Sequence, residues 1–106
     1  MMSDSQKKIL IADAIASVGV RKLESFCKTD CDYSIAPSTL VENIREYNAL
    51  IVRSRTKVTS ELIERGRKLE VIGRCGVGVD NIDIEACRNN GVLVVNSPLA
   101  SSIAVG

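Results

Sequence analysis

The sequence predicts an α/β domain in which five parallel strands form one doubly wound sheet with helices on both faces. Short apolar runs rich in Ile, Leu and Val recur along the chain, as strands buried on both faces require. Between these runs, apolar residues recur three and four positions apart, which is typical of amphipathic helices. The runs begin roughly 17 to 24 residues apart, a spacing that favours strand–helix units over hairpins.

Each element can be assigned in order along the chain. The expected strands are residues 7–12, 31–35, 49–52, 69–72 and 92–95. The expected helices are residues 20–27, 37–47, 59–67 and 83–89. Thr39 and Glu42 have the spacing of a capping box and predict the start of the second helix. Asn90 and Gly91 predict a left-handed end to the fourth helix. Five such units predict a flavodoxin-like sheet.

Length and charge restrict the classes of partner. The 106 residues suit one small domain, which we place at 7–95 after a flexible N-terminus at 1–6. With 14 Lys and Arg against 13 Asp and Glu, the net charge of +1 gives no basic field for nucleic acid or membrane. The start of the sequence lacks the apolar core of a secretory signal, and no apolar run could span a bilayer. We therefore expect a cytoplasmic protein.

Histidine is absent, and the cysteines do not form a recognisable framework. Without histidine, the 106 residues cannot contain a Ser-His-Asp triad or a His-ligated zinc ion. Cys27 and Cys31 have no second pair at zinc-like spacing, so we expect no metal site. We expect all the cysteines, which include Cys75 and Cys87, to be reduced and to pack as small apolar residues.

Candidate binding residues follow the strands. Open α/β sheets bind ligands at the carboxyl ends of their strands, where this sequence places Arg53, Arg55 and Arg74. No acidic neighbour in sequence neutralises these arginines, and a Gly76–Gly78 turn can expose backbone N–H groups to an anion. The sequence therefore predicts a site for a small carboxylate or phosphate. By alternation, we expect only one of Arg53 and Arg55 to face that site.

Simpler interpretations of the same residues remain open. Gly76 and Gly78 can merely permit a tight turn, and Ser54 can cap local backbone groups. The order Gly73-x-x-Gly76-x-Gly78 also differs from the Gly-x-Gly-x-x-Gly fingerprint of dinucleotide sites. We therefore expect that the chain alone does not bind a dinucleotide.

Three sequence blocks resemble the substrate-binding domain of the D-2-hydroxyacid dehydrogenases. The blocks are Val52–Thr59 (VRSRTKVT), Val71–Asp83 (VIGRCGVGVDNID) and Val95–Pro98 (VNSP). The resemblance extends from Lys7 to Val105 and is strongest to the members that oxidise 3-phosphoglycerate with NAD in serine biosynthesis. It implies an oxidoreductase that forms homo-oligomers and takes 3-phosphoglycerate as substrate.

The resemblance also implies a role for each site residue. Arg53, Ser54 and Arg74 would contact the phosphate or carboxylate of the substrate. The amides around Gly76, Val77 and Gly78 would hold the carboxylate, and Val77 would also approach the nicotinamide end of NAD. No catalytic residue and no metal ligand is implied within the chain.

The remaining catalytic parts of the family are not found in this sequence. The resemblance implies a separate NAD-binding domain that carries the catalytic histidine, so this chain alone should be inactive. Residues 96–106 would form a hinge and the start of the crossover to that domain. The family usually has Gly-Asn-Ser/Thr where this chain has Ala100-Ser101-Ser102, so the contact made by that Asn is not implied here.

Other functions of the same fold fit less well. A response-regulator receiver needs an acidic pair, an Asp and a Lys where this chain has Asp13, Arg53 and Asn96. A flavodoxin needs a Ser/Thr/Gly-rich phosphate loop in place of Asp13–Ala16. Two alternatives stay open: another D-2-hydroxyacid dehydrogenase, and a non-catalytic module that binds small anions.

Overall fold

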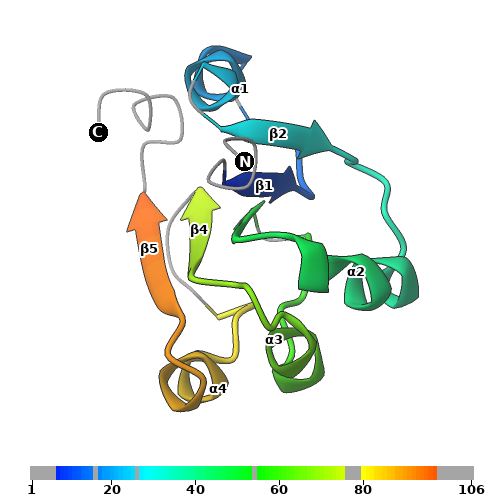
Figure 1. The fold of residues 1–106 in the computed structure, drawn as a ribbon, viewed down its shortest axis with the longest axis vertical. Helices are drawn as coiled ribbons and strands as arrows, with labels where there is room; N and C mark the ends of the chain where they lie inside the picture. The colour runs from blue at the N-terminus through cyan, green and yellow to red at the C-terminus, as the bar shows by residue number, and fades with distance from the viewer. Residues whose placement is uncertain (1–6, 16, 26, 54, 76–79, 98–106) are drawn as a thin grey trace, which may run out of the picture.

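The computed structural model describes residues 7–15, 17–25, 27–53, 55–75 and 80–97 (Figure 1). Five strands alternate with helices along this part of the chain. The strands are β1 (Lys8–Ile11), β2 (Lys28–Cys31), β3 (Ala49–Val52), β4 (Val71–Cys75) and β5 (Leu93–Ser97). The helices are α1 (Ser17–Glu24), α2 (Pro37–Asn43), the 3₁₀ turn η2 (Ile44–Glu46), α3 (Ser60–Arg65) and α4 (Ile84–Asn89).

The strands form a single parallel sheet in the order β2-β1-β3-β4-β5. The chain moves outward from β1 in one direction to reach β2 and in the other direction to reach β3. This is the flavodoxin-like strand order, and it confirms the predicted fold class. The reversal between β1 and β3 places the carboxyl ends of these two strands at the usual position of a ligand site.

Helices pack on both faces of the sheet, as predicted (Figure 1). On one face, α2, α3 and α4 cover a core that includes Leu10, Leu50 and Ile72. On the other face, side chains of α1 pack on Ile9 and Ile11. Among the described residues, that second layer does not extend over β5. Its apolar side chains are consequently exposed: Leu93 is 63% and Val95 is 48% accessible.

The second strand lies earlier than the sequence predicted. The prediction placed it at 31–35, but β2 ends at Cys31. β2 is an edge strand whose residues are exposed or half-buried, so it needs no apolar run. The apolar signal that misled the prediction comes from Ile35, which is buried in the core beyond the strand.

Helix ends differ from the sequence prediction at several places. The helix predicted at 20–27 is α1 at Ser17–Glu24, and the one predicted at 59–67 is α3 at Ser60–Arg65. The capping box of Thr39 and Glu42 is wrong, because α2 begins at Pro37 and its N-cap residue, Ala36, makes no side-chain bond. Proline suits this first position because the helix requires no N–H there. The predicted left-handed end of α4 is confirmed, since Gly91 has φ +70°.

The cysteines divide into two environments. All four are free; Cys75 and Cys87 are buried, Cys27 is half-buried and Cys31 is exposed. The expectation that they pack in the interior therefore holds for Cys75 and Cys87 and is wrong for Cys31, which is exposed at the end of the edge strand β2. Among the described residues, no three His, Cys, Asp or Glu side chains are grouped as metal ligands. None of the described helices has the length and apolar character needed to cross a membrane.

Candidate functional site

Polar residues from three neighbouring strands meet at the carboxyl edge of the sheet. Asp13 lies two residues beyond β1, Arg53 directly follows β3, and Arg74 is the penultimate residue of β4. The register pairs Arg74 with Val52, the residue before Arg53. The structure therefore brings Arg53 and Arg74 to one edge, as predicted. Four other predicted site residues lie outside the described part of the chain: Ser54, Gly76, Val77 and Gly78.

Asp13 is the first of two buried polar residues that hold the segment after β3. Its side chain is 3% exposed. Oδ2 accepts hydrogen bonds from the backbone N–H groups of Arg53 (2.7 Å) and Thr56 (3.1 Å). Oδ1 accepts a bond from the Thr56 hydroxyl at 2.6 Å and lies 2.9 Å from Nε of Arg55. Asp13 thus contacts both ends of residues 53–56.

This set of donors keeps Asp13 ionised. Burial alone would raise the pKa of its carboxyl, because a charge in the interior loses hydration. The hydrogen bonds from the Thr56 hydroxyl and from the N–H groups of Arg53 and Thr56 oppose that effect, as does the charge of Arg55. Together they hold the pKa of Asp13 below its ordinary value. The carboxylate is therefore a stable acceptor at neutral pH.

Asn81 is the second buried polar residue, and its side chain binds the backbone carbonyl groups of Arg53 and Thr56. Its side-chain Nδ2 donates to the backbone oxygens of Arg53 and Thr56, both at 2.7 Å. Its Oδ1 accepts a bond from Nε of Arg74 at 2.7 Å. Asn81 is only 8% exposed, and both the Nδ2 and the Oδ1 of its amide make hydrogen bonds with these partners. It thereby links Arg74 on β4 to the segment after β3.

Part of the positive charge of the arginines is neutralised in the fold. The sequence places no acidic residue beside them, but two of the three have an acidic partner in space. Arg55 pairs with Asp13, which is distant in sequence, and donates to the Ala12 oxygen at 2.8 Å. Nη2 of Arg74 lies 3.8 Å from Oδ1 of Asp80. Because these carboxylates neutralise part of the positive charge, Arg53 is the principal remaining cation of the described set.

Arg53 and Arg74 differ strongly in exposure. The side chain of Arg74 is 6% exposed and rests against Asn81. Arg53 is exposed, and Nη1 makes one long contact of 3.4 Å with the Ala14 oxygen. A bound anion would therefore find accessible donors on Arg53 and would reach less of Arg74. This arrangement can hold a small carboxylate or phosphate by charge-assisted hydrogen bonds.

Cys75, the last residue of β4, is not available as a nucleophile. Burial raises the pKa of its thiol, although the charge of Arg53 opposes this rise. A protonated, 2% exposed thiol is unreactive at neutral pH. The described residues of the site therefore provide binding groups and no activated nucleophile.

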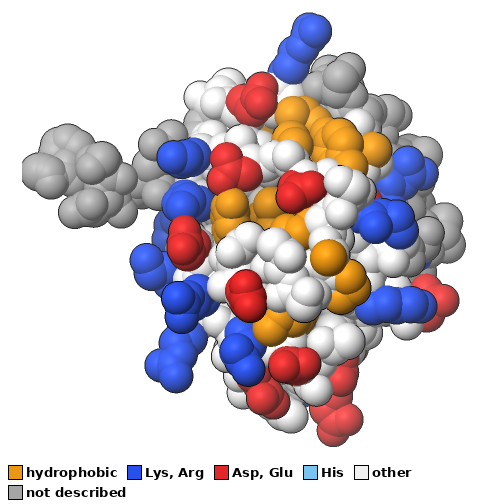
Figure 2. Space-filling view, turned by 90° about the vertical axis from the view of Figure 1, so that its right-hand side faces the viewer, with side chains coloured by type: hydrophobic (Ala, Val, Ile, Leu, Met, Phe, Trp, Pro, Cys, Tyr) orange, Lys and Arg blue, Asp and Glu red, His pale blue; other side chains and the backbone are white. Residues whose placement is uncertain are grey.

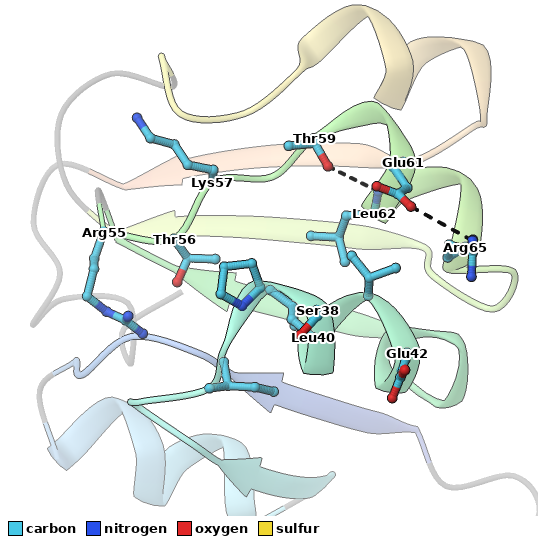
Figure 3. A pocket seen from close by; sticks show the side chains of 13 residues that line it. Ser38, Leu40, Glu42, Arg55, Thr56, Lys57, Thr59, Glu61, Leu62 and Arg65 are labelled. Atoms are coloured by element: carbon cyan, nitrogen blue, oxygen red, sulfur yellow. Dashed lines mark hydrogen bonds and ion pairs between the residues drawn. The ribbon is translucent and has the colours of Figure 1, made fainter.

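A groove of about 590 Å³ runs between α2 and α3, on the helical face next to the site (Figure 3). Leu40 and Leu62 contribute apolar side chains, while Arg55 and Thr56 line the end near the strand termini. Neither Arg53 nor Arg74 lines it. Figure 2 shows this side of the molecule, where apolar side chains lie among charges of both signs. The groove is thus separate from the predicted anion site, although Arg55 and Thr56, which line one end of it, lie close to Arg53 in the chain.

Sequence reasoning missed the roles of Thr56 and Asn81 and treated Asp13 only as a strand end. Thr56 and Asn81 are 8% exposed, and polar residues so buried need partners. Their partners lie 25 to 43 positions away in the chain. The sequence carried one signal of this network: Asp13 is an acid placed directly after an apolar strand.

The chain matches the sequence model of the D-isomer-specific 2-hydroxyacid dehydrogenases, catalytic domain, over residues 9–106. It is 44% identical to D-3-phosphoglycerate dehydrogenase 2 (chloroplastic) of Arabidopsis thaliana over 98 residues, which are 92% of this chain and 16% of that protein. It is 46% identical to D-3-phosphoglycerate dehydrogenase of Methanocaldococcus jannaschii, again over 92% of this chain and 19% of the relative. The chain therefore spans less than a fifth of either relative.

Solved structures agree with these matches. The NAD⁺-bound 3-phosphoglycerate dehydrogenase of Entamoeba histolytica superposes with a TM-score of 0.71 and 30% identity, over 87% of this chain and 33% of that one. The protein PH0520 of Pyrococcus horikoshii has the same fold, with a TM-score of 0.82 at 24% identity over 86% of this chain and 27% of its own. The match over residues 9–106, with curated relatives 44% and 46% identical, shows that the chain belongs to the D-isomer-specific 2-hydroxyacid dehydrogenase family.

Proposed function

We propose that the chain is the substrate-binding part of an NAD-dependent oxidoreductase that converts 3-phospho-D-glycerate to 3-phosphohydroxypyruvate. The observation that carries this proposal is the exposed guanidinium of Arg53, on a segment held by two buried polar residues beside Arg74. A phosphate or carboxylate oxygen is the group that such an arginine binds best. The names of the relatives at 44% and 46% identity support phosphoglycerate as that anion.

The described residues do not by themselves fit a dinucleotide. A pyrophosphate is normally held where a glycine-rich turn leads from a strand into a helix. The glycines that the structure describes lie elsewhere: within α1, after α3, within β4 and after α4. The order Gly73-x-x-Gly76-x-Gly78 also differs from the dinucleotide fingerprint, and the chain spans less than a fifth of its relatives, so the proposal has NAD bound mainly by residues outside this chain. The predicted approach of Val77 to the nicotinamide stays a prediction.

The contribution of this chain is to bind and orient the acid. In the proposed reaction, NAD⁺ takes the hydride from C2 of the substrate. The hydroxyl proton must pass to a base, and the chain has no histidine to accept it. Arg53 would hold one charged end of the substrate, so that C2 projects away from the sheet edge toward the other half of the active site. A hinge at residues 96–106 and a homo-oligomeric state belong to the same proposal.

Titration of the ¹⁵N-labelled chain with 3-phosphoglycerate tests the proposal. We expect saturable shifts at the amides of Arg53, Thr56 and Asn81, with weaker binding of D-glycerate and of sulfate. NAD added with the substrate should give no NADH. Absence of saturable binding, or NADH formation by the purified chain, would contradict the proposed function. Equal affinity for D-glycerate would instead indicate another hydroxy acid as substrate.

A further inference from the structure

We propose that Asp13 is a positioning residue for the substrate, which acts by fixing the backbone of Arg53 and Thr56 and so the place from which Arg53 binds the anion. This inference rests on the proposed function of the site. Asp13 lies on the loop after β1 and is 3% exposed. It is not itself placed to bind an anion, since a carboxylate repels one.

The geometry favours positioning over general stability because the bonds converge on one short segment. Three hydrogen bonds and one ion pair reach the two oxygens of Asp13, and every donor belongs to Arg53, Arg55 or Thr56. The backbone N–H groups of Arg53 and Thr56 share the single atom Oδ2. Two N–H groups that lie three positions apart in the chain therefore point to the same atom.

The opposite side of the segment is fixed too. Asn81 donates to the carbonyl groups of Arg53 and Thr56, the same two residues whose N–H groups bind Asp13. With both N–H and C=O of Arg53 engaged, its backbone has little freedom, and its side chain begins from a defined position. Asp13→Asn removes the charge and leaves one acceptor oxygen for donors that now bind two, while Asn81 still holds the carbonyl side. The chain would stay folded, but Arg53 would start from a spread of positions.

Charge also separates Asp13 from a simple structural residue. Oδ1 of its carboxylate lies 2.9 Å from Nε of Arg55, so this guanidinium is paired within the protein. Arg55 is consequently held toward Ala12 at the groove between α2 and α3 (Figure 3). One buried acid therefore binds the backbone of Arg53 and the side chain of Arg55. Loss of that acid would free Arg55 as well as loosen Arg53.

The test compares 3-phosphoglycerate affinity of the 106-residue chain and its variants by the same NMR titration. We expect Asp13→Asn to weaken binding at least tenfold and to move the amide resonances of Arg53 and Thr56. The matched control is Asp30→Asn, which replaces the charged acceptor of the Tyr47 hydroxyl (2.7 Å) by a neutral amide at a different part of the sheet. We expect its affinity to stay within twofold of the unchanged chain, even where its melting temperature falls.

A second pair of variants decides the matter if Asp13→Asn fails to fold. Thr56→Val removes the hydroxyl that donates to Asp13 while it keeps the side-chain shape, and should weaken binding at least threefold. Thr56→Ser keeps the hydroxyl and should restore affinity to within twofold. Folded Asp13→Asn or Thr56→Val chains that bind as tightly as the unchanged chain would overturn the role of Asp13 and leave the proposed function standing. Failure of the unchanged chain to bind would overturn both.

Discussion

Asp13 and Asn81 hold the same two residues from opposite sides of the chain. Asp13 accepts from the N–H groups of Arg53 and Thr56, and Asn81 donates to their carbonyl oxygens. The backbone N–H and C=O groups of both residues are therefore hydrogen-bonded, as they would be in a strand. It also connects three strands, since Asn81 binds Arg74 of β4. Asp13 and Asn81 thus support, from both sides, the residue that we propose to bind the anion.

Replacing Asn81 by Ala should lower the free energy of unfolding by about 2–4 kcal/mol, because it leaves two carbonyl groups and Nε of Arg74 without these partners. Urea denaturation followed by circular dichroism measures the loss. Asn90→Ala is the matched control: its amide makes one bond, to the Ala86 oxygen, at an exposed position, and its loss should cost less than about 1 kcal/mol. Similar losses in the two variants would contradict the role assigned to Asn81.

The stability that Asp13 contributes should depend on pH in one direction. Its pKa is lower in the folded chain than in the unfolded one, so its contribution is complete above the unfolded pKa, roughly 3.9, and is lost as the pH falls through the folded pKa. The difference in unfolding free energy between the unchanged chain and Asp13→Asn should be greatest near pH 7 and should shrink below about pH 4. Denaturant titrations of both proteins at several pH values give this difference.

Other acids do not confuse that comparison. The hydrogen bond and charge of Lys7 also lower the pKa of Glu70, which is at the opposite end of the sheet. Glu70 titrates in both proteins, so its effect cancels in the difference. A difference that stayed constant from pH 7 to pH 3 would show that the charge of Asp13 does not contribute.

Most of the fold could be predicted because buried parallel strands must be apolar. The runs at Ile9–Ala12, Ala49–Val52 and Val92–Val95 carry that requirement in the sequence itself. β2 could not be placed well, because an edge strand with exposed residues does not need an apolar sequence. The capping box failed for a related reason: Pro37 starts α2 by its fixed backbone angle and needs no side-chain cap.

The site could be predicted only in part. Arg53 follows β3 and Arg74 lies near the end of β4, two strands that are neighbours in the predicted doubly wound sheet, so their proximity follows from topology. The pairing of Asp13 with Arg55 does not, because it depends on which way one loop side chain turns. Local sequence carries no record of a bond between residues more than 40 positions apart. Expecting every buried polar residue to have a partner would have singled out Asn81 and Thr56 only once burial was known.

Gly91→Ala should destabilise the chain by about 1 kcal/mol, since Gly91 has φ +70° and a side chain is strained in that conformation. A Cβ there would meet nothing within 4 Å, so the cost is one of backbone conformation and not of a clash. Gly91→Asn should recover part of the loss, because Asn tolerates the left-handed region better than Ala. Thermal unfolding of the three proteins gives the order Gly, Asn, Ala. An Ala variant as stable as the original would rule out strain at this turn.

Cys31 should react first with iodoacetamide. It is the exposed cysteine, whereas Cys75 and Cys87 are buried and burial raises the pKa of both thiols. Mass spectrometry of peptides after timed labelling should show Cys31 modified early and the two buried thiols only after urea is added. A Cys31→Ser chain should lose the fast phase. Rapid labelling of Cys75 in the native chain would mean that the end of β4 opens readily.

Arg53→Ala should weaken 3-phosphoglycerate binding at least tenfold, since a hydrogen bond to a charged group contributes about 1.5–3 kcal/mol and tenfold corresponds to about 1.4 kcal/mol. Arg53→Lys should fall between the two, because it keeps the charge and loses the paired donors. Arg88→Ala is the control, as Arg88 is an exposed arginine in the last turn of α4, at the far end of the sheet. It should bind within twofold of the unchanged chain. If Arg53→Ala keeps a native spectrum and full affinity, the anion is held elsewhere and Arg53 has no part in the site.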